Sequence, residues 1–256
     1  MAPAAAPRGA VVIVHGLKDH SSRYDGFARR VVAEGFAVHA FDLRGHGRSE
    51  GVRVAIDDFS EYLDDLAVEL VRVRAREPGV PVFLMGHSMG GAIVTLFALE
   101  RRPAVSGLVL SAAALAVDAS AITVGGTKAV AAISPDAGVF QLDLDDFSRD
   151  PAVVAENRAD PLVYQDAAPA RTAALLIGAI DTIGEREGEL DVPVLALHGD
   201  ADHVTPPEGS RELVRRARTR DKTLKTYPGL VHDLLHEPER ETVVRDIVAW
   251  LDARAR

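Results

Sequence analysis

The stretch LMGHSMGGAIV (84–94) places a serine among glycines, after one apolar run and before another. Its centre is the pattern Gly-x-Ser-x-Gly around Ser88. The apolar run 80–86 reads as a buried strand, and residues 89–101 have a helical pattern. A sharp strand-to-helix turn requires small neighbours on both sides of its central residue, because strand and helix approach closely there. The pattern therefore predicts that Ser88 is exposed on such a turn.

The rest of the chain repeats this alternation of short apolar runs and longer amphipathic stretches. We expect strands at 10–16, 37–42, 80–86, 105–113, 192–199 and 224–229, and helices at 24–36, 57–76, 89–101 and about 238–254. Strands that alternate with helices imply an α/β fold, with a mostly parallel sheet flanked by helices on both faces.

The alternation is interrupted between residues 114 and 190. This stretch has scattered prolines and weaker helical patterns, and it is too long for a structureless loop inside a compact domain. We predict a mainly helical cap there, inserted between the core parts 1–113 and 191–256.

Composition restricts the function. The chain has 256 residues, 47% of them hydrophobic, and 38 acidic against 29 basic side chains give a net charge of −9. Such a field repels phosphate backbones, so we expect no nucleic-acid partner. The absence of cysteine excludes disulfides, thiolate zinc sites and a cysteine nucleophile. The N-terminal apolar run is too short for a signal peptide or a membrane span, which favours a cytoplasmic location.

A serine hydroxyl becomes a good nucleophile only beside a base that a carboxylate orients. After one later strand the sequence offers Asp200 and Asp202, and after the last strand it offers His232 and His236. The order Ser, Asp, His is that of α/β-hydrolases. The alternative is an ordinary helix-entry turn, with Ser88 as the N-cap residue.

Five segments together resemble the monoacylglycerol lipases, serine hydrolases of the α/β-hydrolase superfamily. They are HGLKDHSSRY (15–24), FDLRGHGRSEG (41–51), GHSMGG (86–91), HGDADHVTPPEGS (198–210) and YPGLVHDLLHEPER (227–240). They extend over nearly the whole chain.

By position, the resemblance implies that Ser88 is the nucleophile, Asp202 the orienting acid and His232 the base. It implies an oxyanion hole formed by the main-chain N–H groups of Leu17 and Met89. Asp200 is then a turn residue. His236 would cap or pack, and His87 would point elsewhere in a structural role.

The chain departs from the family in three places. Lys18 stands where relatives have a small residue, often glycine, and Asp19 stands where they have glutamate. If that backbone position needs a positive φ, Lys18 is strained or the loop differs. Relatives also carry two antiparallel strands before the first strand found here. We expect a sheet shortened at its N-terminal side, and the alternative is that the chain begins later than the natural protein.

Two other motifs offer alternative sites. HGDADH (198–203) is similar to the H-x-H-x-D-H signature of binuclear metallohydrolases, with Asp200 in place of the second histidine. Asp42, Arg44 and His46 could also be proposed as catalytic, although a turn held by an Asp–Arg pair explains them better. His20 would support the loop that begins at His15.

The expected reaction is hydrolysis of a lipid ester through an acyl-enzyme, which needs no cofactor and no metal. A monoacylglycerol is the leading substrate, ahead of lysophospholipids and simple esters, and a non-catalytic hydrolase-like binding protein is the alternative of another class. The sequence shows no committed anchor, so contact with a micelle or membrane would be transient, and it leaves the oligomeric state open. The acyl chain would meet apolar residues of the cap: Leu115, Val117, Ile122, Val124, Val130, Ile133, Val139 and Phe140.

Overall fold

A six-stranded sheet forms the centre of the computed structural model, which describes residues 1–117 and 124–255. The strand order is β2-β1-β3-β4-β7-β8, and every neighbouring pair is parallel. The strands are β1 (Ala10–Val14), β2 (Ala37–Ala40), β3 (Val82–His87), β4 (Gly107–Ser111), β7 (Val194–Gly199) and β8 (Lys222–Tyr227). Each lies where the sequence predicts a strand, and the predicted α/β class is confirmed.

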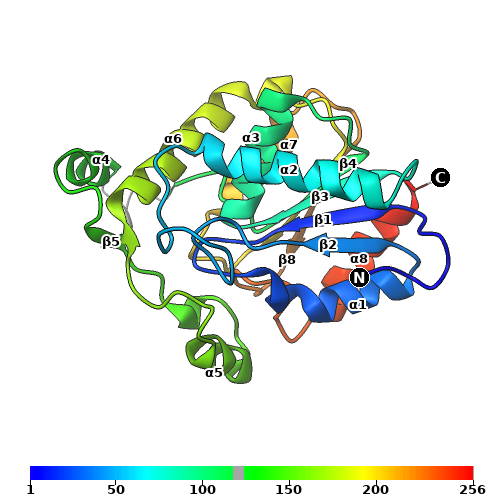
Figure 1. Cartoon of the computed structure of the whole chain (residues 1–256), viewed down its shortest axis with the longest axis horizontal. Coiled ribbons are helices and arrows are strands. Elements are labelled where there is room, and N and C mark those ends of the chain that lie inside the picture. The colour runs from blue at the N-terminus through cyan, green and yellow to red at the C-terminus, as the bar shows by residue number, and fades with distance from the viewer. Residues whose placement is uncertain (118–123, 256) are drawn as a thin grey trace.

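Helices cover both faces of this sheet. Figure 1 shows α2 (Ser60–Arg76) and α3 (Met89–Arg101) on one side of the strands, and α1 (Asp25–Ala33) and α8 (Arg240–Asp252) on the other. Alternate residues of β1 enter two separate hydrophobic clusters, one with α2 and α3 and one with α1 and α8. Both faces of β1, β3, β4 and β7 are buried, so these four strands appear in the sequence as mostly apolar runs, whereas the edge strands β2 and β8 are partly exposed.

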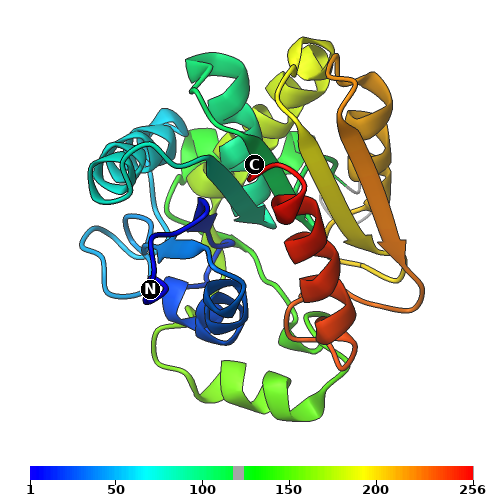
Figure 2. The same ribbon diagram turned by 90° about the vertical axis from the view of Figure 1, so that its right-hand side faces the viewer.

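One helix of the core was not predicted from the sequence. It is α7 (Pro207–Arg216), which packs on the same face as α3. Leu213 is its only large apolar side chain that is fully buried, and most of its other residues are polar. Figure 2 shows α8 running across the other face of the sheet, with β7 and β8 side by side at its edge.

The segment predicted to be a cap is mainly helical. It contains α4 (Val124–Ile133), β5 (Gly138–Phe140), η2 (Leu144–Asp146), α5 (Pro151–Ala159), β6 (Ala168–Pro169), α6 (Ala170–Arg186) and η3 (Glu187–Glu189). β5 and β6 pair in an antiparallel ribbon. In Figure 1, α4, β5 and α5 lie beyond the end of the sheet that is opposite the two chain termini.

Among the described residues of this segment, the most exposed large apolar side chain is Ile133, at the end of α4, which is 86% exposed. Val130 of α4 and Val139 of β5 are each more than one-third exposed. Across residues 1–117 and 124–255, none of the helices is both long enough and apolar enough to cross a membrane.

Glycines set how closely α3 approaches the sheet. A Cβ atom at Gly86 would overlap the main-chain carbonyl of Gly90, and a Cβ at Gly90 would overlap the carbonyl oxygen of Val14 in β1. A Cβ at Gly91 would overlap the side chain of Ala113, next to the end of β4. The first turn of α3 is therefore in direct backbone contact with β1 and β3.

We predict that Gly90→Ala lowers the free energy of unfolding by about 3 kcal/mol, because the added methyl group can be accommodated only by moving backbone. The matched control is Gly178→Ala in the interior of α6, where a Cβ would meet nothing within 4 Å. This control should stabilise the protein by about 0.5–1 kcal/mol, because alanine favours a helix more than glycine does. Urea unfolding of both variants measures the difference, and equal effects would contradict the argument.

Candidate active site

Ser88 lies on a strained turn between β3 and α3. Its φ is 52° and its ψ −122°, in a region that residues other than glycine rarely occupy. The Ser88 N–H donates to the carbonyl of Ser111 at 3.1 Å, and the Ser88 carbonyl accepts from the N–H of Ala114 at 3.0 Å. Ser88 stands at the N-cap position of α3, but its side chain makes no capping hydrogen bond, so the hydroxyl does not cap the helix.

Leu17 and Met89, the residues predicted to supply an oxyanion hole, line the same cavity as Ser88. Neither main-chain N–H donates a hydrogen bond to another residue in the described part of the chain. Met89 is the first residue of α3, so its N–H lies at the positive end of the helix dipole. The loop that carries Leu17 passes close to the serine, because a Cβ at Gly16 would lie 3.2 Å from the Cβ of Ser88.

Lys18 does occupy the left-handed region, with a φ of 66°. Its side chain is buried, and the ammonium nitrogen lies 6.0 Å from the centre of the Tyr164 ring. The Lys18 carbonyl also accepts a hydrogen bond from the Tyr164 N–H at 3.0 Å. These two contacts accompany a backbone conformation that glycine adopts without strain but a lysine does not.

The side chains of Asp202 and His232 form a hydrogen-bonded pair. Asp202 follows β7 and His232 follows β8, and both side chains are fully buried. His232 Nδ1–H donates to Asp202 Oδ2 at 2.9 Å, while Asp202 Oδ1 accepts from the N–H groups of Val204 at 2.8 Å and Thr205 at 3.0 Å. Burial alone would raise the pKa of Asp202, but the neighbouring imidazole of His232 and the hydrogen bonds hold it well below its usual value.

The second ring nitrogen of His232 has no such partner. Nε2 is buried and forms no hydrogen bond to any residue that the structure describes. The ring of His87 lies 4.8 Å from the ring of His232, and Phe147 presents an edge at 5.2 Å on another side. His87 Nδ1–H donates to the Ser111 carbonyl at 3.2 Å, which is a structural role.

Burial, together with the neighbouring His232, lowers the pKa of His87 to about 4. His87 is therefore neutral near pH 7, and it packs against His232 without adding a charge.

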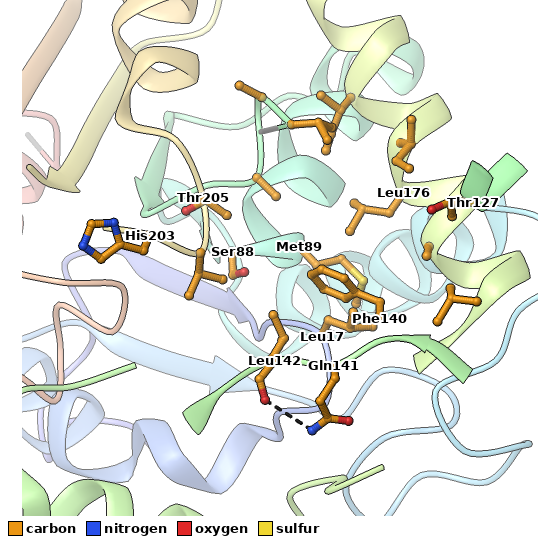
Figure 3. Close-up of a pocket in the computed structure, with 18 of the residues that line it drawn as sticks. Leu17, Ser88, Met89, Thr127, Phe140, Gln141, Leu142, Leu176, His203 and Thr205 are labelled. Carbon is orange, nitrogen blue, oxygen red and sulfur yellow. Dashed lines mark hydrogen bonds between the residues drawn. The ribbon is translucent and has the colours of Figure 1, made fainter. Parts of the chain in front are cut away.

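Thr205 connects the Asp202–His232 pair to the cavity of Ser88. It lines that cavity, and its hydroxyl oxygen lies 2.9 Å from Asp202 Oδ2 and 3.3 Å from His232 Nδ1. Figure 3 shows Ser88 close to Thr205 and Met89, at one end of the cavity. No hydrogen bond joins the Ser88 hydroxyl to His232. Such bonds are often long in an enzyme without substrate and shorten when it binds.

A buried ionic cluster adjoins His232. Arg23 donates to Asp233 Oδ2 at 2.6 Å and to Asp19 Oδ1 at 3.0 Å, which connects the loop after β8 to the loop after β1. His236 Nδ1–H donates to Asp233 Oδ1 at 2.9 Å, and Nε2–H donates to the carbonyl of Arg23 at 3.0 Å. His236 therefore packs and bonds in place, as expected.

The cavity around Ser88 has a volume of about 610 Å³. Figure 3 shows it extending from Ser88 and His203 towards Thr127 of α4. Most of its wall is apolar, formed by Leu17, Met89, Ala114, Ala116, Val117, Val130, Val139, Phe140, Leu142, Ala173, Leu176, Ile177, Ile180 and Val204. Its polar and acidic residues, besides Ser88, are Thr127, Gln141, Asp143, Asp146, His203 and Thr205.

Four of the residues expected to meet an acyl chain are in this wall, namely Val117, Val130, Val139 and Phe140. The others are not: Leu115 is buried in the core, Val124 and Ile133 are absent from the wall, and Ile122 lies outside the described residues. Sequence reasoning missed the contribution of α6, whose Leu176, Ile177 and Ile180 line the cavity.

The motif DLRGHGRS forms a turn, but not through the expected Asp–Arg pair. Asp42 accepts main-chain hydrogen bonds from Ser21 and Arg48, both at 2.7 Å. Arg44 instead pairs with Asp65 at 2.7 Å and with Glu61, both on α2. His20 bonds to Asp160 of the cap segment at 3.0 Å and to Ser22 at 2.9 Å.

The polar groups of the HGDADH segment form hydrogen bonds with other residues of the protein. Asp200 accepts from the N–H of Gly229 at 2.6 Å, as a turn residue does. His198 has protein partners at both nitrogens, Ser210 at Nδ1 and Asp202 with Thr205 at Nε2. Among residues 1–117 and 124–255, no group of three His, Asp or Glu side chains is arranged to hold a metal ion.

A strained serine turn at the C-terminal edge of a parallel sheet, with an Asp–His pair from the loops after β7 and β8, defines a serine hydrolase of the α/β-hydrolase class. Comparison with known proteins agrees. The family model "Serine aminopeptidase, S33" matches residues 5–239. The chain belongs to this family.

Individual relatives are more specific. A monoacylglycerol lipase from Mycolicibacterium smegmatis is 41% identical over 96% of this chain and 88% of its own length. A human monoglyceride lipase is 35% identical over 98% of this chain and 85% of its own length. The solved structure of Paleococcus ferrophilus monoacylglycerol lipase superposes with a TM-score of 0.88 at 33% identity, over 99% of this chain and 96% of that one. These relatives confirm the resemblance seen in the motifs, and the chain is a serine ester hydrolase.

The His236 contacts predict a pH dependence of stability. Burial alone would lower the pKa of His236, but the Asp233 carboxylate raises it above its ordinary value of 6.5. A raised folded-state pKa contributes stability that is complete below the unfolded pKa and is lost as pH rises through the folded pKa. The free energy of unfolding of wild type minus that of His236→Gln should therefore be larger at about pH 5.5 than at about pH 9. Urea unfolding at the two pH values measures this, and a pH-independent difference would contradict it.

Proposed function

We propose that Ser88, His232 and Asp202 form the catalytic triad of a monoacylglycerol lipase. The observation that carries the proposal is the common cavity: Ser88, on its strained turn, shares apolar walls with the free N–H groups of Leu17 and Met89. Thr205 lines the same cavity, and its hydroxyl contacts both members of the Asp202–His232 hydrogen bond, in which Nε2 is the unpaired nitrogen.

In the proposed reaction, His232 Nε2 accepts the proton of the Ser88 hydroxyl as the oxygen attacks the ester carbonyl. Asp202 accepts from His232 Nδ1, so it holds the ring in the tautomer that leaves Nε2 free and it stabilises the imidazolium. The N–H groups of Leu17 and Met89 donate to the oxyanion, and one lost donor of this kind typically costs about 3–4 kcal/mol of barrier. His232 then protonates the leaving alcohol, and water releases the fatty acid by the same route.

The cavity favours a neutral lipid ester. Its apolar wall suits an acyl chain, and its ionisable lining residues are Asp143, Asp146 and His203, with no lysine or arginine among the lining residues described. Carboxylates repel a phosphate group but can accept hydrogen bonds from glycerol hydroxyls. A monoacylglycerol therefore fits better than an anionic lysophospholipid, in agreement with the names of the relatives.

We also propose that residues 114–190 act as the cap over this cavity, because side chains of α4, β5 and α6 form much of its wall. The exposed Ile133 and Val130 of α4 would make the transient contact with a micelle or membrane surface that delivers the substrate. The cytoplasmic location expected from the sequence stays a prediction.

A fluorophosphonate probe tests the triad, because it reacts with an activated serine. We expect one label per chain at Ser88, complete loss of labelling in Ser88→Ala, and at least about a 10⁴-fold loss of kcat. Ser60→Ala, at the start of α2, is the matched control and should keep full labelling. EDTA should leave turnover unchanged. If a chelator abolishes turnover and Ser88 is not labelled, the result supports the metal interpretation. If the protein shows no labelling and no turnover, the result supports a non-catalytic binding protein.

The charge of the lining predicts the choice of head group. For the same acyl chain, kcat/KM for the monoacylglycerol should exceed that for the lysophosphatidic acid by about 100-fold. The reason is that a phosphate placed next to carboxylates of the same charge costs several kcal/mol. The double variant Asp143→Asn and Asp146→Asn should narrow this ratio while preserving activity on the neutral ester. Equal rates on both lipids in the wild type would contradict the assignment of a neutral head group.

A further inference from the structure

Two histidines, not one, bond to the same oxygen of Asp202. His232 Nδ1 lies 2.9 Å from Asp202 Oδ2, and His198 Nε2 lies 3.1 Å from that same atom. All three side chains are fully buried. His198 belongs to β7, four residues before Asp202, so it approaches the carboxylate from the sheet and not from the cavity.

The surroundings of His198 determine which nitrogen carries its proton. Nε2 faces Asp202 Oδ2 and, at 3.0 Å, the carbonyl oxygen of Thr205, and both of these atoms are acceptors. Nδ1 lies 2.7 Å from the hydroxyl of Ser210, a buried residue of α7, and this hydroxyl can donate to it. Nε2 therefore carries a proton that is directed at the carboxylate.

We propose that His198 is a positioning residue that acts through Asp202 to lower the basicity of His232. The inference rests on the triad proposed above. A carboxylate that already accepts an N–H from one imidazole has less negative charge to offer to a second. Asp202 then stabilises the imidazolium of His232 less, so His232 stays unprotonated, and able to accept the serine proton, at lower pH.

Other ionisable groups near the pair are the same in all the variants below. They are His87 from β3, His203 from the loop after β7, Asp233 from the loop after β8, and Asp19 with Arg23 from the segment before α1. Asp233 is committed to Arg23 and His236, so it does not take the place of Asp202. A difference between variants at position 198 therefore reports on the His198–Asp202 contact.

The test compares His198→Leu with His198→Gln through the pH dependence of kcat/KM. Leucine removes the N–H, whereas the glutamine amide can place an N–H near the position of Nε2. We expect the acid limb of the His198→Leu profile to move to higher pH by about 0.5–1 unit. His198→Gln should keep the wild-type acid limb, and all three proteins should converge in rate above about pH 8.

A direct measurement keeps the inference separate from the proposed function. NMR titration of the His232 ring in Ser88→Ala, with and without His198→Leu, needs no activity and should show the same upward shift. If His198→Leu does not fold, Ser210→Ala replaces it, because it keeps the ring but frees its tautomer, and the shift should have the same direction.

His198→Leu could lose activity or have a lower melting temperature while its acid limb and its His232 titration stay unchanged. That result would overturn the inference and leave His198 a purely structural residue. A wild-type protein that neither hydrolyses esters nor reacts with the probe would overturn the triad instead.

Discussion

Direct backbone contact between α3 and the central strands β1 and β3 is the constraint on which the site depends. Only glycine fits at positions 86 and 90, where a Cβ would overlap a main-chain carbonyl. With the helix held this close, the chain must turn from strand to helix at a single residue, and Ser88 does so with a φ of 52° and a ψ of −122°. The same contact places the Met89 N–H beside the serine and opens both groups to the cavity.

Two buried carboxylates, Asp202 and Asp233, have different structural roles around His232. Asp202 faces His232 and accepts further hydrogen bonds from main-chain N–H groups and from His198, so its negative charge is distributed over several donors. Asp233, the residue after His232, is paired with Arg23 and thereby fixes the loop that carries His232. A buried carboxylate without such donors would be too costly to keep ionised, so the network both maintains the charge and positions the imidazole.

The sequence was informative wherever a local pattern depends on one kind of physical constraint. Buried parallel strands require continuous apolar runs, which predicted β1, β3, β4 and β7, and the partly exposed edge strands β2 and β8 were predicted as well. The order of Ser88, Asp202 and His232, each after a strand, indicated that they lie at one edge of a sheet, and the structure brings the last two into hydrogen-bond contact. By contrast, α7 was missed, because a mostly polar helix with one large buried side chain, Leu213, leaves almost no periodic signal.

The sequence by itself therefore determined the α/β class, the strand-to-helix turn at Ser88 and the loops that supply its partners, because sterics and apolar periodicity act between near neighbours in the chain. Only the tertiary structure decided which polar groups pair. Arg44 bonds to α2 and not to its neighbour in the motif, and His198 donates to the oxygen that His232 also uses. Hydrogen bonds depend on distance and direction in space, and these follow from packing between elements that are far apart in the chain.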